Sequence, residues 1–481
     1  MLTAGLVAGF VVFLASVWHI YPPQLWLFFD YVKYWAVTIV FNLASLSVGA
    51  AAMKKLVPTG LRLRERAVLS IALGTLIFFL GMYVAGLFHL YGGVFFVLFP
   101  ALLIGVGPAG LWRSVARAVP LWKRARRLPY RRPSWTQALI FASGVIGLFM
   151  VYAPVIVPEN TAYDSKWYHL PIAEHYVAVG GMERFVEGWF QGALPHLSSF
   201  LYAWPMMAPF GSMTDKVLMC AHLEFTLFLW TLFAIPVLVR FIVPTSRPSL
   251  AWVAMFLFPG IFLYDSSLGI AADRVAAFWA IPIFLALALF WRTFELRLAV
   301  LLGALLAAAM LTKYQAISLV VLPIGAVVAR FVWLTFKAPT GKRTRPLISA
   351  VVAGAVMIAV FAPHWLKNWV WYGDPAYPWT HKYFASRPWT PDTAQRLESI
   401  HTNHLWTPRG DSTAEKLWVT AKAVGTFSLI PNDWVQLHRN VPVFGSLFTL
   451  LVFALPFLRA PRRLWGLFMC ANAGVFAWYW Q

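Results

Sequence analysis

The sequence predicts an all-α fold, namely one polytopic bundle of about 13 transmembrane helices. Composition is the first reason, because 60% of the 481 residues are hydrophobic and only 12% are charged, far from the averages of soluble domains. The second is that apolar runs of about twenty residues recur along the chain, which is the length of a membrane-spanning helix. Only helices and closed barrels satisfy every backbone hydrogen bond in lipid, so these runs indicate a helical bundle without a large soluble domain.

The expected helices fall into two regions of the chain. Residues 1–136 form an N-terminal module of four spans and a basic loop, and residues 137–481 contain the remaining spans. The first apolar run has no Lys or Arg before it and no small-residue cleavage site, so we expect a retained span and not a signal peptide. The expected spans are 2–18, 35–53, 67–87, 92–109, 137–157, 215–239, 249–264, 269–291, 297–311, 315–336, 347–365, 443–459 and 464–480.

The charged residues are distributed asymmetrically between the two ends of these spans. Lys and Arg concentrate in one set of short loops, for example residues 54–66 and 113–132, which face the cytoplasm by the positive-inside rule. Nearly all acidic residues fall in the opposite set, which faces outward. Anchoring to anionic headgroups explains the net charge of +21, so we expect membrane lipids as partners and no nucleic acid. The outer loops contain no Asn-x-Ser/Thr sequon, which favours a bacterial inner membrane with a periplasmic or extracellular outer face.

Two long outer segments interrupt the bundle. In the first, residues 158–214, Asp164 can cap an interfacial helix that continues through His175, and residues 197–207 are apolar enough to dip into the interface. The second, residues 366–442, is rich in Trp, Pro, His and Asn and has little apolar periodicity. Long loops on a rigid bundle are where functional sites are usually found.

A first candidate site lies in the segment from Tyr163 to Pro171, directly after a span. A carboxylate at Asp164 can deprotonate an attacking hydroxyl group, and Tyr163, Tyr168 and His169 can shape a substrate pocket around it. The alternative is that Asp164 only caps an interfacial helix. The two interpretations are compatible.

A second candidate site combines a carboxylate and a cation at the same face. Asp273 opens a span from the outer side, and an ionisable residue at membrane depth is a functional candidate by default. The alternative is a carboxylate favoured by the helix dipole and paired with an arginine. Arg274, the next residue, is a candidate for binding a phosphate group. Lys313 is on the outer side, which is the wrong side for a positive-inside anchor, and it suits a phosphate group, with Tyr314 beside it, although snorkelling to the interface is the alternative.

A further segment, Pro363 to Pro375, ends another span at this face. Lys367 adds a cation for a phosphate, and His364, Asn368 and Trp369 offer hydrogen-bonding and stacking surface for a sugar. The alternative is an aromatic belt of the kind found at any membrane boundary.

Metal and cofactor chemistry have little support in the sequence. No DxD, HExxH or CxxC motif occurs, and the histidines of the outer loops lack a recognised ligand spacing, so we expect no essential metal and no cofactor. Cys220 and Cys470 both fall inside apolar runs, where they are expected to be small buried hydrophobes and not a disulfide framework.

Taken together, these motifs resemble the GT-C superfamily of polytopic membrane glycosyltransferases, particularly bacterial relatives of protein mannosyltransferases and aminoarabinose transferases. The resemblance covers residues 137–481 and depends on the order of the motifs and on their common side. The matching motifs are Tyr163-Asp164-Ser165-x-x-Tyr168-His169-Leu170-Pro171, Asp273, Thr312-Lys313-Tyr314, Lys367-Asn368-Trp369 and Tyr372-Gly373-Asp374-Pro375-Ala376-Tyr377-Pro378.

The resemblance implies a GT-C-like bundle that transfers a sugar, with inversion, from a polyprenyl-phosphate donor to an envelope glycan, lipid or protein acceptor. It implies Asp164 as the general base, Asp273 as the supporting acid and Lys313 as a ligand of the donor phosphate. The first four spans are expected to be an added module. Relatives often continue into an Arg-Tyr-x-x-Pro segment after the last span, so we also expect a chain shortened at its C-terminus.

Two other classes of protein stay open at this point. A transporter or flippase of a lipid-linked or anionic substrate would place polar groups near the membrane midplane, and His222 and Glu224 lie deep enough to keep this class open. A scaffold for envelope assembly would tolerate replacement of Asp164, Asp273 and Lys313 one at a time. Most charges lie at helix ends, which favours the glycosyltransferase.

Overall fold

The computed structural model describes most of the chain, and every regular element in the described part is helical, which confirms the all-α class. Within this part, eight helices are long and apolar enough to cross a membrane, and two shorter apolar helices accompany them. The described residues are 2–22, 25–57, 60–110, 134–157, 161–185, 189–243, 268–337, 344–378 and 410–426, with isolated residues in 112–123, 380–384 and 455–466. The long helices are α1 (Leu2–Ile20), α2 (Leu27–Leu56), α3 (Leu63–Leu87), α6 (Trp135–Val155), α9 (Met213–Ile242), α12 (Asp273–Thr293), η4 (Tyr314–Leu319) together with α14 (Val321–Lys337), and α15 (Thr344–Tyr372); the short ones are α4 (Gly93–Val106) and α13 (Leu296–Thr312).

These helices follow the order of the expected spans. The eight long and two short helices coincide with ten of them. Of the other three expected spans, 249–264 lies outside the described residues, and 443–459 and 464–480 are described only at isolated residues. The total of about 13 therefore stays a prediction.

The ends of the helices differ more from the expectation. α2 and α9 each have 30 residues, and α15 continues to Tyr372. The second outer loop therefore begins after Tyr372 and not at residue 366, a correction that places His364 and Asn368 on one helix. Polar and aromatic residues near a helix end lower the hydropathy without interrupting the backbone hydrogen bonds, so an apolar window ends too early.

The expected outer loop 366–442 also contains a helix that hydropathy missed. This helix, α17 (Thr413–Thr426), begins with Glu415 in its first turn. The carboxylate of Glu415 accepts hydrogen bonds from the amides of Asp411 and Ser412, at 2.8 and 3.1 Å. A short polar helix fixed by its own N-terminal hydrogen bonds has no apolar run to reveal it.

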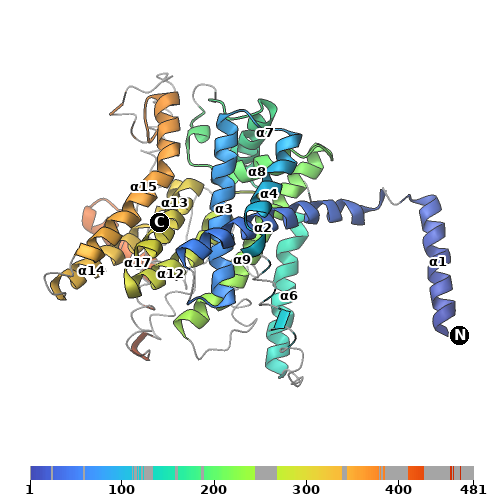
Figure 1. Ribbon diagram of the computed structural model, residues 1–481, viewed down its shortest axis with the longest axis horizontal. Helices are drawn as coiled ribbons and strands as arrows, with labels where there is room; N and C mark the ends of the chain where they lie inside the picture. Colours follow the sequence, from blue (N-terminus) through green and yellow to red (C-terminus); the bar gives the residue numbers. More distant parts are fainter. Residues whose placement is uncertain are drawn as a thin grey trace.

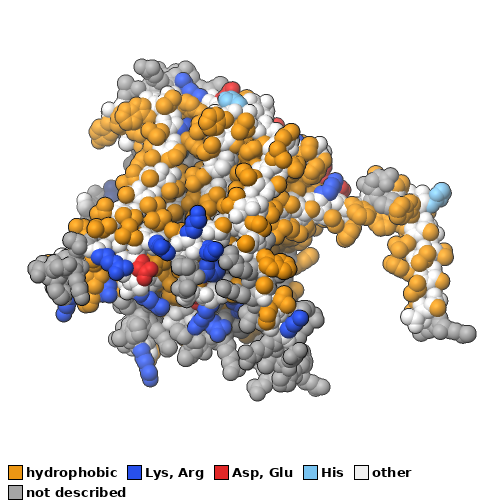
Figure 2. All heavy atoms as spheres, in the orientation of Figure 1, with side chains coloured by type: hydrophobic (Ala, Val, Ile, Leu, Met, Phe, Trp, Pro, Cys, Tyr) orange, Lys and Arg blue, Asp and Glu red, His pale blue; other side chains and the backbone are white. Residues whose placement is uncertain are grey.

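The basic ends of several helices meet at one end of the bundle, as the positive-inside rule predicts. Arg292 at the end of α12 lies over the ring of Phe241 at the end of α9. Ser349, near the start of α15, donates a hydrogen bond to the carbonyl of Phe294 at 2.7 Å. Figure 2 shows Lys and Arg side chains gathered across the lower half of the molecule, and Figure 1 shows the connected helix ends in the same region.

The opposite end carries α7 (Leu170–Ala178) and α8 (Leu197–Met206), which lie at the top of Figure 1 beside the upper end of α3. Tyr83 of α3 donates a hydrogen bond to the carbonyl of Pro363 in α15 at 2.7 Å, which ties these two helices together there. We had expected residues 197–207 to dip into the membrane interface. Every residue of α8 is instead buried in protein, and Trp204 donates to the carbonyl of Phe96 at 3.0 Å. Hydropathy alone does not distinguish burial in lipid from burial in protein.

Small residues allow the N-terminal helices to pack closely. A Cβ atom added at Gly49 of α2 would lie 1.8 Å from the carbonyl oxygen of Ser70, and one added at Gly74 of α3 would lie 1.8 Å from that of Ser45. Close backbone approach through small residues is the usual way in which membrane helices associate. One continuous hydrophobic core joins α2 and α3 to α8, α9, α12, α13 and α15, whereas α1 lies apart in Figure 1.

The two ends of the bundle should be accessible from opposite sides of the membrane. In a variant with Cys220 and Cys470 replaced by alanine, Arg64→Cys and Thr136→Cys should react with an impermeant maleimide only from the cytoplasmic side. Glu174→Cys on α7 should react only from outside, because the positive-inside rule orients the basic end inward. Labelling of Glu174→Cys and Thr136→Cys from the same side would contradict this topology.

Candidate functional site

A small cavity of about 60 Å³ lies at the end of the bundle opposite the basic helix ends. Four of the residues selected from the sequence line it, namely Tyr168, His169, Lys313 and Tyr314. They come from two distant segments, the π-helix η2 (Ser165–His169) and the junction between α13 and η4. The rest of the wall consists of Gln191, Leu194, Pro195, His196, Ala272, Thr312 and Gln315.

Asp164 does not line this cavity and does not cap a helix. Its backbone is already helical, at φ −60° and ψ −33°, and its side chain makes no capping hydrogen bond, so the expected capping role was wrong. The hydroxyl of Tyr168 instead donates to Asp164 Oδ2 at 3.0 Å. Burial and the neighbouring carboxylate raise the pKa of the Tyr168 phenol far above its usual value, so Tyr168 remains a hydrogen-bond donor.

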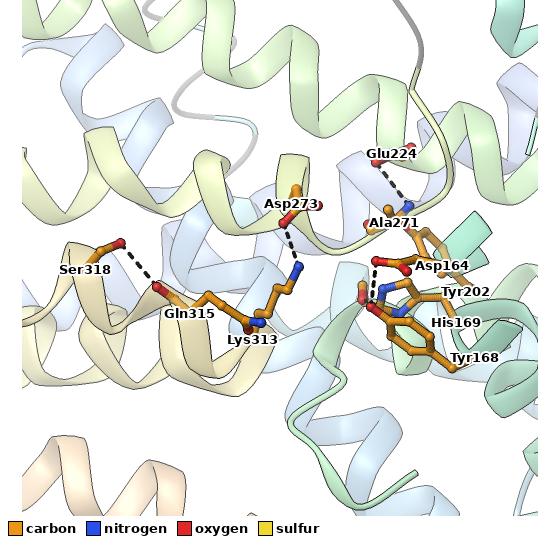
Figure 3. Close-up of polar contacts among 11 residues, drawn as sticks. Asp164, Tyr168, His169, Tyr202, Glu224, Ala271, Asp273, Lys313, Gln315 and Ser318 are labelled. Atoms are coloured by element: carbon orange, nitrogen blue, oxygen red, sulfur yellow. Dashed lines mark hydrogen bonds and ion pairs between the residues drawn. The ribbon is translucent and has the colours of Figure 1, made fainter. Parts of the chain in front are cut away.

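Lys313, which lines the cavity, forms an ion pair with Asp273. Lys313 Nζ lies 2.9 Å from Asp273 Oδ1, and the lysine side chain is 17% exposed while that of the aspartate is 56% exposed. Asp273 begins α12, as the dipole argument requires, but its partner is Lys313 and not the expected arginine. Figure 3 shows the Lys313 ammonium pointing toward Asp273 and the Tyr168 hydroxyl toward Asp164. Lys313 is thus held within the site and does not snorkel freely.

His169 contributes a buried neutral imidazole to the cavity wall. Its Nδ1 lies 3.2 Å from the hydroxyl of Ser199, and its buried Nε2 has no hydrogen-bond partner among the described residues. Burial, with a smaller effect of the Lys313 ammonium, lowers the pKa of His169 to about 3, although Asp273 opposes this. A buried ring nitrogen without a partner costs free energy, so it is well suited to meet a polar group of a ligand.

The residues expected on α15 lie behind the cavity wall and not on it. His364 Nε2 lies 3.2 Å from the Tyr314 hydroxyl. Asn368 donates to the carbonyl of Ala193 at 2.9 Å, and the buried Lys367 ammonium contacts the carbonyl of Gly192 at 3.4 Å. These contacts hold Tyr314 and the neighbouring η3 (Phe190–Ala193) in place. In this structure Lys367 reaches a backbone carbonyl and not the cavity.

Three other expected site residues lie away from the cavity. Tyr163 is 71% exposed and packs against Trp167, and Trp369 is 58% exposed on the outer surface of α15. Arg274 does not line the cavity, and its charge acts on Glu224. Their predicted roles therefore rest on the sequence resemblance alone.

Glu224 is a positioning residue whose role the sequence did not reveal. Its Oε2 accepts a hydrogen bond from the amide of Ile270 at 2.8 Å and its Oε1 one from the amide of Ala271 at 3.4 Å. Tyr202 donates to the carbonyl of Ala271 at 2.8 Å, so both residues fix the loop directly before Asp273 (Figure 3). The sequence does show Glu224 as an acidic residue within an apolar run, which indicates a special role. It does not show that the partner is the backbone before Asp273.

The described residues contain no group of three or more His, Cys, Asp or Glu side chains that could hold a metal ion. Comparisons with known proteins add no family to this description, since no family model, curated protein or solved structure matches the chain.

The free energy of unfolding should depend on pH because His169 is a neutral imidazole in the folded protein. Its pKa is about 3 in the folded protein, below the ordinary value of 6.5, so the unfolded chain binds the proton more tightly. The free energy of unfolding should be intact above pH 6.5 and should fall by up to about 1.4 kcal/mol per pH unit as the pH drops toward 3. In His169→Asn this acid-induced loss should be smaller, as measured by thermal unfolding of the purified protein.

The exposed His19 on α1 offers a matched control, and His19→Asn should leave the profile as it is in the parent protein. Burial also lowers the pKa of His196 well below its usual value, so some acid-induced loss should persist in His169→Asn. An unchanged loss in His169→Asn would show that His169 is not a buried neutral group.

Proposed function

We propose that this protein is an inverting, GT-C-like glycosyltransferase that moves a sugar from a polyprenyl-phosphate donor to an envelope glycan, lipid or protein acceptor. The observation that supports this most directly is a cavity at one end of a membrane helix bundle that His169, Tyr168 and Lys313 line, with Asp164 bonded to Tyr168 and Asp273 bonded to Lys313. A lipid-linked donor requires such a site at the membrane boundary, with a base and a phosphate-binding cation within reach of each other.

In the proposed reaction, the pair of Tyr168 and Asp164 takes up the proton of the acceptor, and the pair of Asp273 and Lys313 binds the phosphate. The acceptor hydroxyl attacks the anomeric carbon, the bond from this carbon to the phosphate oxygen breaks, and the acceptor proton passes to the carboxylate of Asp164. Tyr168, which donates to Asp164 at 3.0 Å, orients that carboxylate. The leaving polyprenyl phosphate gains negative charge, which the ammonium of Lys313 stabilises. Asp273 keeps this ammonium in position.

The size of the cavity limits what it can hold. About 60 Å³ is far below the roughly 300–1,000 Å³ of pockets that enclose whole small molecules. The cavity therefore suits the reacting phosphate and anomeric centre, with the remaining sugar and the prenyl chain outside it. The unpartnered Nε2 of His169 is available for one hydroxyl or phosphate oxygen there.

A transporter gains less support from the deeper polar residues. Glu224 is occupied by two backbone amides. His222 is bonded to the carbonyl of Leu218 at 2.8 Å and lies 3.2 Å from the hydroxyl of Tyr152. Polar side chains whose hydrogen bonds are satisfied internally are not poised to bind a passing substrate.

Asp164→Asn should remove most of the catalytic activity and leave the fold intact. Asparagine keeps the size of the side chain and can still accept the hydrogen bond from Tyr168, but it cannot take the acceptor proton. Release of polyprenyl phosphate from a panel of polyprenyl-phosphate sugars should fall by about 10²- to 10⁴-fold while donor binding and thermal stability persist. Glu174→Gln, at an exposed carboxylate on α7, is the matched control and should stay active. Full activity in Asp164→Asn would refute its role as base.

Lys313→Gln should weaken binding of the donor. A charge-assisted contact to phosphate typically contributes about 1.5–3 kcal/mol, so the dissociation constant for polyprenyl phosphate should rise by roughly 10- to 150-fold. Lys166→Gln, at an exposed lysine on η2, removes the same charge without touching the cavity and should leave the affinity unchanged. An equal affinity in both variants would reduce Lys313 to a structural partner of Asp273.

A further inference from the structure

A second and larger cavity, of about 340 Å³, lies at the opposite, basic end of the bundle. It opens where the connection from α2 to α3 meets the turn from α12 to α13. Two arginines, Arg292 and Arg297, and the carboxylate of Glu295 line it together with leucines such as Leu56 and Leu289. The cavity therefore combines an apolar wall with two cations and one anion.

The two arginines are available for an external anion. The guanidinium carbon of Arg292 lies 4.6 Å from the centroid of the Phe241 ring, and this stacking orients the group while no hydrogen bond from it to another described residue is found. Among the described residues no carboxylate forms an ion pair with Arg292 or Arg297, although Glu295 stands between them in the chain. Arginine binds phosphate in a two-pronged geometry, so the pair suits a phosphate group.

The position of the cavity indicates where such a phosphate comes from. It lies among helix ends that carry exposed basic residues, including Lys54 and Arg64, which is the pattern of a cytoplasmic membrane boundary. A soluble anion would gain nothing from the leucines in the wall, whereas a lipid can place its glycerol and first acyl carbons against them. Basic pockets between helices on this side of a membrane bind lipid headgroups.

Glu295 adds a chemical preference within the phospholipids. A headgroup that can donate a hydrogen bond, such as the ammonium of ethanolamine or the hydroxyl of glycerol, can satisfy this carboxylate beside the phosphate. Choline carries no N–H or O–H and cannot. We propose that this cavity binds one phospholipid of the cytoplasmic leaflet through Arg292 and Arg297, and that Glu295 favours headgroups that donate hydrogen bonds.

The test is lipid binding by the full chain in detergent, measured by native mass spectrometry and thermal unfolding. Phosphatidylethanolamine or phosphatidylglycerol should bind and raise the unfolding temperature, and phosphatidylcholine should do so much less. Arg292→Gln combined with Arg297→Gln should weaken the lipid affinity by about tenfold or more, because charge-assisted contacts are lost. Arg64→Gln, an exposed arginine that does not line the cavity, should keep the parent affinity. Glu295→Gln should reduce the preference over phosphatidylcholine.

Several outcomes would overturn the proposal. Parent-like lipid affinity in the double arginine variant would exclude the cavity as the binding site. Stabilisation by inorganic phosphate as strong as that by lipid would indicate a site for a soluble anion. Equal binding of phosphatidylcholine would remove the role of Glu295. If the double glutamine variant does not fold, Arg292→Lys with Arg297→Lys keeps both charges but loses the two-pronged geometry, and it should still bind lipid more weakly than the parent.

Discussion

The hydrogen bonds from the amides of Ile270 and Ala271 to the buried carboxylate of Glu224 are the interaction on which the candidate site depends. Both amides belong to the loop before α12, and Ile270 is buried, so its amide would lack a partner without Glu224. Ile270 also has a positive φ of 55°, a conformation that a β-branched residue adopts only when its surroundings hold it. The carboxylate of Glu224 accepts the hydrogen bonds of both amides and thereby holds Ile270 in this conformation. The position of Asp273, and through it of Lys313, follows from this contact.

The bundle supports this contact through helix packing on both sides. The close approach of α2 and α3 at Gly49 and Gly74 leaves room for α8 in the core, and Trp204 of α8 packs against Phe78 of α3. α8 also carries Tyr202, which holds the other side of the Ala271 peptide. The N-terminal helices therefore help to position the loop before α12 without contributing a side chain to the cavity. The basic end of the bundle is separate from this arrangement and contains its own cavity.

The sequence predicted the order of the helices well because apolar run length follows directly from the thickness of the bilayer. It also brought Tyr168, His169 and Lys313 to one face, since alternating loop charges identify which helix ends lie together. It did not predict contacts that depend on three-dimensional packing. The burial of α8, the partners of Glu224 and the pairing of Tyr168 with Asp164 all depend on neighbours that are distant in the sequence or on a local π-helix. The helix ends were missed because polar residues continue a helix beyond its apolar run.

The ion pair between Asp273 and Lys313 determines how strongly Lys313 can act on a ligand. An ammonium group has three donors, and one of them is used at 2.9 Å by Asp273. Lys313 is mostly buried while Asp273 is mostly exposed. Water therefore screens the charge of the carboxylate more strongly than the charge of the ammonium. The pair thus keeps the lysine oriented. Its remaining donors, next to the uncharged imidazole of His169, are left to bind a departing phosphate in the proposed reaction.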